Sequence, residues 1–313
     1  MQAVVIDDGT LRLDERPEPV AGDTELLVAV RAAGLNGADM LQRRGRYPAP
    51  PGWPDDIPGM EFAGEVAKVG RQVSRFRAGD RVMALVGGGG QATFAVVDEA
   101  HALAVPEGVD WTAAGGFPEV FATAHDALFT QAALRPGDRL LVTGAAGGVG
   151  TAAVQLGAAT GARVVASVRD ASLRDGVAAL GADDVVDPSE VADSGPYDVV
   201  LELVGAASLP RALGALSPGA RVVVIGVGSG AKVELDLLRL MGSRARISAS
   251  TLRGRDKVSK AVVVAEVAAH VLPLLADGRV CVPVAGTFAM SEAAAAYDRF
   301  EEGGKLGKVV LLA

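Results

Sequence analysis

The sequence contains little cysteine and few aromatic residues, which often build functional sites or stabilise small folds. Among 313 residues there is one cysteine, Cys281, and only 4% of the residues are aromatic. A single cysteine excludes an intrachain disulfide and any metal site made of several cysteines. Because 50% of the residues are hydrophobic and so few are aromatic, we expect cores made of Val, Ala and Leu. A chain of this length can hold two domains with substantial cores.

Positive charge is also in short supply. The chain carries 30 basic and 38 acidic residues, which gives a net charge of −8. A negative chain disfavours non-specific binding to nucleic acid or to an anionic membrane. Residues 1–5 show no secretory signal, and the most apolar stretch, 261–276, contains Glu266, His270 and Pro273, which favours a packed helix over a membrane span. We therefore expect a cytoplasmic protein with no nucleic acid and no membrane among its partners.

One glycine-rich stretch lies between a predicted strand at 140–142 and a predicted helix at 151–159. Gly144, Gly147 and Gly150 recur there at every third position. Glycine allows a tight turn, close approach of the backbone to a pyrophosphate and close packing of helix on strand, and the helix N-terminus favours phosphate. The spacing G-x-x-G-x-x-G departs from the usual G-x-G-x-x-G, so the strand–turn–helix context carries the prediction of a dinucleotide site. A Gly/Ala-rich turn without a ligand is the alternative.

The first third of the chain has the texture of an irregular β-rich barrel. Short strand-like runs separated by Gly and Pro are expected at 3–6, 11–13, 25–33, 61–69, 81–85, 93–97 and 102–104. Functional residues in such a domain are expected on the loops. From about residue 111 the texture changes, and residues 112–129 predict two helical pieces interrupted at Pro118.

The middle of the chain alternates strands with helical segments. Strands are expected at 140–143, 163–167, 185–186, 198–203, 221–226 and 246–250. This order predicts an α/β fold with a doubly wound parallel sheet. A long helix after 258, a strand at 284–288, a helix capped by Ser291 and a last strand at 308–312 should return to the first domain. The predicted domains are therefore 1–120 together with 258–313, and 121–257.

Six further motifs accompany the glycine stretch in a fixed order. They are AAGLNGAD at 32–39, QRRGRYP at 42–48, IPGMEFAG at 57–64, GDRV at 79–82, STLR at 250–253 and GKVVL at 307–311. With these motifs the chain resembles the medium-chain dehydrogenase/reductase superfamily, and within it the zinc-free quinone oxidoreductase (zeta-crystallin-like) branch. The resemblance implies a GroES-like β-rich catalytic domain, a Rossmann dinucleotide-binding domain and a homodimer.

The resemblance also draws attention to two substituted positions. Alcohol dehydrogenases of the superfamily bind a catalytic zinc through a Cys in the motif around Gly34 and a His in the motif around Gly59. Here those positions hold Asn36 and Met60, which lack the donors that zinc prefers. We therefore expect no metal. Hydride donation to a conjugated acceptor needs no Lewis acid, because the acceptor delocalises the incoming charge.

By the same resemblance, the candidate catalytic residues are Asn36, Asp39 and Tyr47. Asn36 and Asp39 would position the nicotinamide ribose or the substrate, and loop hydrogen bonding is an equal alternative for Asp39. Tyr47 lies where enoyl-thioester reductases carry a proton-donating Tyr, and the alternative is a packing aromatic. Glu61 would orient the loop or be an ordinary partnered carboxylate. The candidate cofactor-binding residues are Thr123, Gly144, Ala145, Gly147, Gly148, Val149, Gly150, Ser167, Arg169, Arg174, Gly226, Ser250, Thr251 and Lys308.

The choice of cofactor depends on the end of the predicted strand at 163–167. Sites specific for NAD usually place an acidic residue at this tip, where it accepts a hydrogen bond from the ribose 2′-OH. Ser167 stands there instead, and Arg169 and Arg174 follow, a combination that suits a 2′-phosphate. The sequence therefore predicts NADPH. The alternative is that Asp170 holds an unphosphorylated ribose.

Three functions fit these features. The first, which we favour, is NADPH:quinone reduction without metal, with a small-molecule quinone or a similar conjugated carbonyl as acceptor. The second is reduction of other activated double bonds in enals, enones or enoyl thioesters. The third is NADPH binding without turnover, since the quinone oxidoreductase branch includes lens crystallins and membrane-associated relatives.

Overall fold

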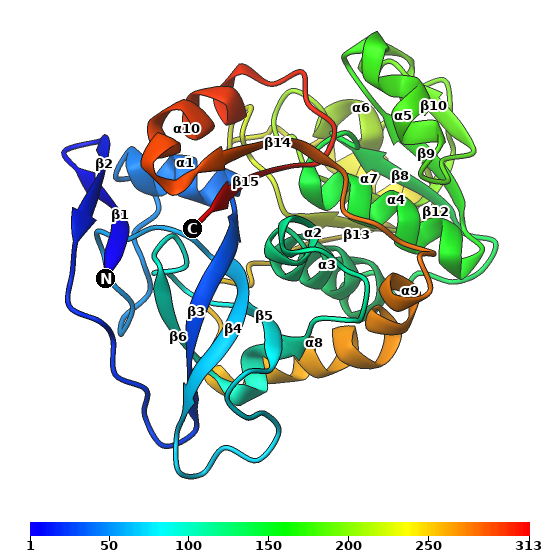
Figure 1. Cartoon of the computed structure of the whole chain (residues 1–313). Coiled ribbons are helices and arrows are strands. Elements are labelled where there is room, and N and C mark those ends of the chain that lie inside the picture. Colours follow the sequence, from blue (N-terminus) through cyan, green and yellow to red (C-terminus); the bar gives the residue numbers. More distant parts are fainter. The chain divides into compact units, whose positions relative to one another are not determined.

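In a computed structural model, residues 1–313 are described and divide into two compact units (Figure 1). Unit 1 comprises Met1–Ala122, Leu252–Gly303 and Lys308–Ala313. Unit 2 comprises Thr123–Thr251 and Gly304–Gly307. None of the helices combines the length and the apolar character that a membrane span requires.

Unit 1 is built on a seven-stranded, mostly antiparallel sheet. Its order is β14-β15-β3-β4-β5-β7, and β6 also pairs with β3. The strands are β3 (Glu25–Gly34), β4 (Glu61–Val69), β5 (Arg81–Leu85), β6 (Phe94–Asp98), β7 (Ala102–Ala104), β14 (Val284–Ala289) and β15 (Lys308–Leu312). A separate hairpin joins β1 (Gln2–Asp7) and β2 (Thr10–Glu15). The last strand, β15, pairs antiparallel with β3, which brings the C-terminal elements into this sheet.

The sheet of unit 1 has one face in an apolar core. Alternate residues of β3 (Leu26, Val28 and Val30) pack there with Phe62 of β4 and Val82 of β5. This period of two follows from the opposite directions of successive strand side chains. Burying each such side chain stabilises the fold by about 1.5–3 kcal/mol.

The helices of unit 1 are short except for one. They are α1 (Gly37–Arg43), α2 (Trp111–Gly115), α8 (Lys257–His270), α9 (Leu272–Ala276) and α10 (Ala293–Glu302), and α3 (Pro118–His125) begins in this unit. The predicted cap Ser291 is wrong. Ser291 lies inside the 3-10 turn Met290–Glu292, where the Glu292 carboxylate accepts from the backbone N–H of Ala289 at 2.9 Å. The carboxylate replaces the shorter serine hydroxyl as acceptor for the free N–H at this end.

Unit 2 contains a six-stranded parallel sheet of order β10-β9-β8-β11-β12-β13. The strands are β8 (Arg139–Thr143), β9 (Arg163–Ser167), β10 (Asp184–Val186), β11 (Tyr197–Glu202), β12 (Leu216–Val224) and β13 (Arg246–Ala249). In chain order this is 3-2-1-4-5-6, the order of a doubly wound dinucleotide-binding sheet. The predicted fold class, a β-rich domain with a doubly wound parallel-sheet domain, is confirmed.

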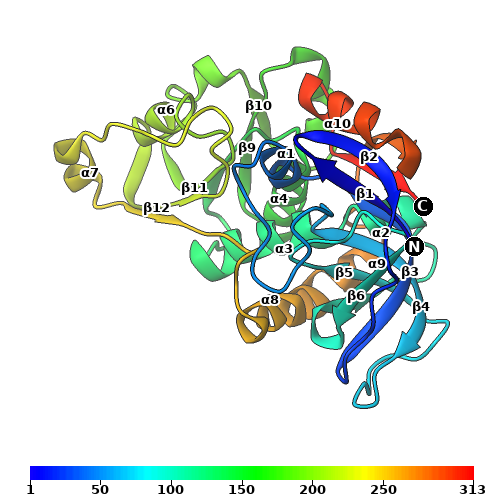
Figure 2. The ribbon, with the colours of Figure 1, turned by 90° about the vertical axis from the view of Figure 1, so that its left-hand side faces the viewer.

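Four helices of unit 2 pack against the strands of its sheet. They are α4 (Gly148–Thr160), α5 (Arg174–Ala178), α6 (Leu209–Leu213) and α7 (Leu237–Ser243). Figure 2 shows α6 and α7 beside β11 and β12. Leu140, Leu141 and Val142 of β8 are fully buried in succession, which is typical of a parallel strand covered on both faces.

Candidate functional site

The carboxyl ends of the strands of unit 2 meet at one edge of the sheet. Thr143 of β8 pairs with Ser167 of β9, and Glu202 of β11 pairs with Val224 of β12. The strand order reverses at β8, between β9 and β11. Ligands of open α/β sheets bind outside the strand carboxyl ends at such a switch point.

The glycine stretch forms the turn from β8 into α4. Gly144 adopts φ +60°, a conformation that L side chains rarely adopt. Gly147 is the N-cap of α4, and the first bond of the helical ladder runs from Thr151 N–H to Gly147 O at 2.8 Å. The helix therefore begins at Gly148 and not at 151 as predicted. The N–H groups of Gly148, Val149 and Gly150 precede this ladder, so no carbonyl of the helix accepts from them, and a parallel β-bridge joins Gly147 to Gly307 beside them.

Glycine is needed at two of these positions for different reasons. A Cβ on Gly150 would lie 2.6 Å from Ala145 Cα, so this glycine lets the helix approach the turn. A Cβ on Gly147 would meet only Gly144 O, at 3.5 Å, so the side-chain direction of this residue is open although its backbone bridges to Gly307. Open backbone at the start of a 13-residue helix fits the pyrophosphate of a dinucleotide.

A second wall of this site was missed by the sequence analysis. The segment Gly304–Gly307 belongs to unit 2, and Gly307 N–H donates to Ala146 O at 2.8 Å. Leu306 lies against α5, since a Cβ on Gly176 would be 2.8 Å from its Cδ2. The sequence feature that could have indicated this wall is the set of glycines at 303, 304 and 307, because glycine allows one backbone to approach another closely.

A buried carboxylate beneath the turns was also missed. Glu202 is fully buried, and its Oε1 accepts from Thr143 Oγ1 (2.9 Å), Val204 N–H (2.7 Å) and Gly205 N–H (2.8 Å). Its Oε2 has no hydrogen-bond partner. Glu202 thus fixes the turn after β11, and Val204 of that turn lies next to Gly144. The sequence feature that could have indicated Glu202 is its place as an acidic residue at the end of an apolar strand.

Gly226 has a packing role in the neighbouring turn. A Cβ there would lie 2.1 Å from Leu203 O, so no larger residue fits without a shift of the backbone. Its N–H donates to Glu202 O at 3.1 Å. Gly226 therefore lies at the strand ends as predicted, and its contacts are with the protein.

The residues predicted to bind the 2′-phosphate differ in exposure and in their partners within the protein. Ser167 is nearly buried and its carbonyl accepts from Ala145 N–H at 3.2 Å, while Arg169 is exposed. Arg174 donates to Val168 O at 3.2 Å and to Asp187 at 2.8 Å. The expectation that Arg174 shares the phosphate stays a prediction, and the charge of Arg174 already has a carboxylate partner in Asp187. The Asp170 carboxylate accepts from the hydroxyl and N–H of Ser172, which lowers the pKa of Asp170.

Thr123, Ser250 and Thr251 lie at the ends of elements in unit 2. Thr123 is buried in α3, which continues into the π turn Asp126–Gln131. Ser250 follows β13, and its Oγ donates to Asp126 Oδ2 at 3.4 Å. Thr251 is exposed. The structure therefore brings Ser250 to the helix that carries Thr123.

In unit 1, three side chains form a buried ionic cluster. The Lys308 ammonium donates to Leu35 O (2.6 Å), Asn36 Oδ1 (2.7 Å) and Glu61 Oε1 (2.6 Å), and Lys308 is 2% exposed. All three of its donors are used. The contact of Lys308 with the cofactor stays a prediction, and in this structure its donors are engaged within unit 1.

Asn36 and Asp39 are held in the same region by the loop itself. Asn36 Nδ2 donates to Glu61 Oε1 at 2.9 Å and, weakly, to Gly34 O. Asp39 is fully buried and accepts from the N–H groups of Asn36 (2.8 Å) and Gly59 (3.2 Å). Burial raises the pKa of Asp39 to about 6. Both residues hold the loop, as the alternative for Asp39 expected, and their catalytic roles stay a prediction.

Glu61 has the orienting role that the sequence left open. Its second oxygen, Oε2, accepts from Glu119 N–H at 2.8 Å, at the start of α3. Glu61 therefore joins β4, the Asn36 loop and α3 through one fully buried carboxylate.

Tyr47 differs from the other two catalytic candidates. It lies on the loop after α1 and its side chain is only half-buried. Its backbone carbonyl accepts from Arg253 at 3.1 Å, and the Arg253 guanidinium carbon lies 5.2 Å from the centre of its ring. No hydrogen bond from the protein occupies its phenol oxygen, so this group is available to a ligand.

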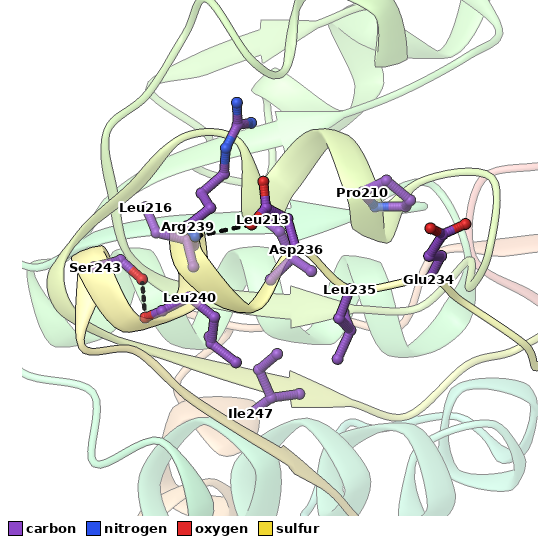
Figure 3. Close-up of a pocket in the computed structure, with 10 residues that line it drawn as sticks. All are labelled: Pro210, Leu213, Leu216, Glu234, Leu235, Asp236, Arg239, Leu240, Ser243 and Ile247. Carbon is purple, nitrogen blue, oxygen red and sulfur yellow. Dashed lines mark hydrogen bonds between the residues drawn. The ribbon is translucent and has the colours of Figure 1, made fainter.

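A separate pocket lies in unit 2 between α7 and the strands beside it (Figure 3). Its walls are mainly apolar side chains, among them Leu213, Leu216, Leu240 and Ile247. Asp236, also in the wall, accepts from Arg239 N–H at 3.0 Å and caps α7. None of the predicted site residues lines this pocket, so we do not assign it to the cofactor.

Comparison with known families follows the division into two units. The alcohol dehydrogenase GroES-like domain family matches residues 22–107, and the zinc-binding dehydrogenase family matches residues 148–267. The chain belongs to the medium-chain dehydrogenase/reductase superfamily. The parallel sheet of unit 2 has the NAD(P)-binding fold of this superfamily.

Relatives of this superfamily member are varied. It is 33% identical over 220 residues to a quinone oxidoreductase-like protein 2 homolog of Nematostella vectensis, which covers 67% of this chain and 60% of the relative. It is 32% identical over 300 residues to a mycocerosic acid synthase-like polyketide synthase of Mycobacterium tuberculosis, covering 93% of this chain and 14% of the synthase. The chain thus spans only a small part of the polyketide synthases it matches, 4% and 14% in two cases.

Solved structures of the superfamily share the whole fold. The mycobacterial protein Rv1454c, solved in complex with NADPH, is 26% identical, with a TM-score of 0.89 and full coverage of both chains.

The name of the second matching family raises the question of zinc, and the residues do not fit it. Asn36 and Met60 are buried at the positions of the Cys and His ligands, and neither offers a thiolate or an imidazole. The Lys308 ammonium lies 2.7 Å from Asn36 Oδ1, so a positive charge already contacts the nearest donor atom. A second cation beside it would be repelled.

Proposed function

We propose that this protein is an NADPH-dependent reductase that transfers hydride, without a metal, to quinones or similar conjugated carbonyl acceptors. One observation carries the proposal: the positions that would hold a catalytic zinc carry Asn36 and Met60, and Asn36 is bonded to the Lys308 ammonium. Without a Lewis acid, an acceptor must itself delocalise the charge that arrives with the hydride, as quinones and conjugated carbonyls do.

The residues divide the work of binding between them. The N–H groups of Gly148, Val149 and Gly150 would hold the pyrophosphate at the start of α4. Ser167 and Arg169 would meet the adenosine ribose and its 2′-phosphate, since Asp170 is engaged with Ser172. When bound, NADPH would supply the hydride. The structural neighbour Rv1454c was solved in complex with NADPH, which supports this choice of cofactor.

Reduction of enones or enoyl thioesters is the second candidate. The observation that favours it is the unoccupied phenol of Tyr47, a group able to donate a proton to a carbanion. Similarity to polyketide synthases is consistent with this candidate, although the chain spans only a small part of those proteins.

We test the proposal by NADPH oxidation with a panel of quinones, enones and an enoyl thioester, with and without a strong chelator. We expect turnover with quinones that the chelator does not reduce, and elemental analysis without stoichiometric zinc. One tightly held zinc per chain would refute the metal-free reaction. Turnover only with enoyl substrates would select the second candidate, and tight NADPH binding without any turnover would select a binding protein.

We also propose that the protein is a cytoplasmic homodimer. Neither nucleic acid nor a membrane is among its proposed partners. The negative net charge supports both exclusions. Three large apolar side chains of α7 are exposed: Leu237 (64%), Leu238 (81%) and Met241 (71%). Apolar side chains gathered on one short helix favour a protein interface. Analytical ultracentrifugation of the wild type and of Leu238→Glu tests this, and a monomeric wild type would refute it.

A further inference from the structure

The loop that carries Tyr47 has few bonds of its own. Residues 45–55 connect α1 with the segment before β4 without any helix or strand. Gly45 and Gly52 adopt positive φ values of 66° and 88°, and a Cβ on either would meet nothing within 4 Å. Something outside the loop must fix its position if Tyr47 is to meet an acceptor reproducibly.

Arg253 supplies one such contact within unit 1, beside the packing of Trp53 on the core and the bond from Gln42 Nε2 to Asp55 O at 3.0 Å. Its Nε donates to Gly87 O at 2.7 Å, one terminal nitrogen donates to Tyr47 O at 3.1 Å, and the other donates to Gln42 Oε1 at 2.6 Å. One planar guanidinium thus joins α1, the Tyr47 loop and the glycine segment after β5. The planar guanidinium presents these donors in fixed directions, so the three acceptors are held in one plane.

The charge of Arg253 is buried without a carboxylate in contact. Arg253 is 5% exposed and its three acceptors are neutral. Burial lowers the pKa of Arg253, and the charge of the Asp39 carboxylate opposes this shift. Lys260 is 2% exposed, donates to Arg253 O at 3.1 Å and lies 5.7 Å from the centre of the Trp53 ring. Burial, and secondarily Arg253, lowers the pKa of Lys260.

Two buried cations therefore lie against two aromatic residues of one loop. A buried charge without an ionic partner is costly, and a neutral side chain could pack this loop at a lower cost. Hydride addition to a conjugated acceptor develops negative charge on the acceptor oxygen, and a fixed cation nearby stabilises such charge.

We propose that Arg253 is the positioning residue of Tyr47. Its guanidinium holds the backbone of the loop at Tyr47 O and lies over the Tyr47 ring, so a cation stays beside the side chain that contacts the acceptor. The inference rests on the proposed function, since it assigns a role in handling the acceptor. Arg253 acts through Tyr47 and does not itself react.

A double-mutant cycle tests the role. Arg253→Lys keeps the charge and loses the three-way fork. Loss of one charge-assisted hydrogen bond, about 1.5–3 kcal/mol, corresponds to roughly a 10- to 100-fold fall in kcat/KM for the acceptor. In a Tyr47→Ala background the same change should lower kcat/KM by less than about twofold, because coupled residues are non-additive. KM for NADPH should stay within about twofold, since the cofactor residues lie in unit 2.

Arg43→Lys is the matched control. Arg43 donates to Gly9 O at 3.0 Å and lies 5.9 Å from the ring of Tyr297, so it also joins a tyrosine to a carbonyl in unit 1. We expect Arg43→Lys to leave the acceptor kinetics unchanged in both backgrounds. If Arg253→Lys does not fold, Gln42→Met removes one acceptor of the fork and should give a smaller loss of the same kind.

Hydrogen exchange gives a readout that does not depend on turnover. Exchange of the amides at 45–55 should speed up in Arg253→Lys and not in Arg43→Lys. An equal loss of kcat/KM in both Tyr47 backgrounds, no loss at all, or unchanged exchange in the loop would each overturn the assignment. Failure of the proposed function is seen earlier, as a wild type that reduces no acceptor. In that case the exchange data alone decide whether Arg253 holds the loop.

Discussion

The two units build their candidate sites from different materials. In unit 2 the site is made of backbone: the glycine at 147, whose side-chain direction is open, and the N–H groups at the start of α4. In unit 1 it is made of charged side chains taken out of water, such as Lys308 (2% exposed), Glu61 (0%) and Asp39 (0%). A backbone site depends on local conformation, whereas a buried charge depends on every element that removes it from water.

This contrast has an energetic consequence. Backbone N–H groups at a helix start are present in any such helix and cost little to maintain. Buried ions must be compensated by partners, and loss of one partner leaves the other uncompensated. We therefore expect substitutions in unit 1 to act mainly on stability, and substitutions at the glycine turn to act mainly on cofactor binding.

The largest effect should come from Lys308→Met. It leaves the Glu61 carboxylate buried without its ammonium, and we expect a loss of about 3–5 kcal/mol in the free energy of unfolding. Urea unfolding measures this. Adding Glu61→Gln should recover much of the loss, while the exposed pair Lys68–Glu18 at 3.5 Å serves as control. Equal small effects of Lys308→Met and Lys68→Met would contradict the distinction between the units.

Asp39 gives unit 1 a pH dependence of defined sign. Its pKa is raised from 3.8 to about 6, so the folded state holds a proton that the unfolded state releases. Its contribution to stability is therefore greatest at low pH and is lost as pH rises from about 4 to about 6, by roughly 3 kcal/mol. Over this window, stability of Asp39→Asn relative to wild type should rise by that amount. A constant difference across the window would show that burial does not perturb Asp39.

The glycines separate packing from binding within unit 2. Gly150→Ala places a methyl 2.6 Å from Ala145 Cα and should destabilise the protein by roughly 1–3 kcal/mol. Gly147→Ala meets only Gly144 O at 3.5 Å, so its unfolding free energy should change by less than about 0.5 kcal/mol. Its Kd for NADPH should nevertheless rise about tenfold, measured by fluorescence titration. Normal NADPH affinity in Gly147→Ala would place the pyrophosphate elsewhere.

Arg169 tests cofactor choice at the other end of this site. Arg169→Ala should raise KM for NADPH about tenfold and leave KM for NADH nearly unchanged, because one charge-assisted bond is worth about 1.5–3 kcal/mol. Arg174→Ala is the control and should have a smaller effect, since Arg174 is already bonded to Asp187. A wild type that uses NADH as well as NADPH would instead assign the ribose to Asp170.

The smallest effect is expected for Tyr47→Phe with a quinone. If solvent supplies the proton, kcat should change by less than about threefold, because removal of a general acid would cost about 10²–10⁴-fold. The same variant with an enone acceptor separates the two candidate reactions. A large loss with quinones in a correctly folded variant would make the phenol a proton donor.

Several elements followed directly from the residue pattern. The bounds of β4, β5 and β7 match the predicted 61–69, 81–85 and 102–104. Gly70 follows β4 directly, and Gly87 and Pro106 lie two residues beyond β5 and β7. Errors fell where a residue other than the expected one begins a helix. α4 begins at Gly148 because Gly147 caps it, and Glu292 replaces Ser291 at the start of the last helix.

The sequence by itself determined the superfamily, the parallel sheet of unit 2 and the glycine turn, because each depends on short-range patterns of apolar residues and glycine. Only the tertiary structure decided the roles of Lys308, Asn36 and Asp39, and revealed Glu202 and Arg253. Lys308 and Asn36 are 272 positions apart, and Arg253 and Tyr47 are 206 apart. A charged residue has the same letter whether it meets a cofactor or a buried partner, and only folding determines which partner removes it from water.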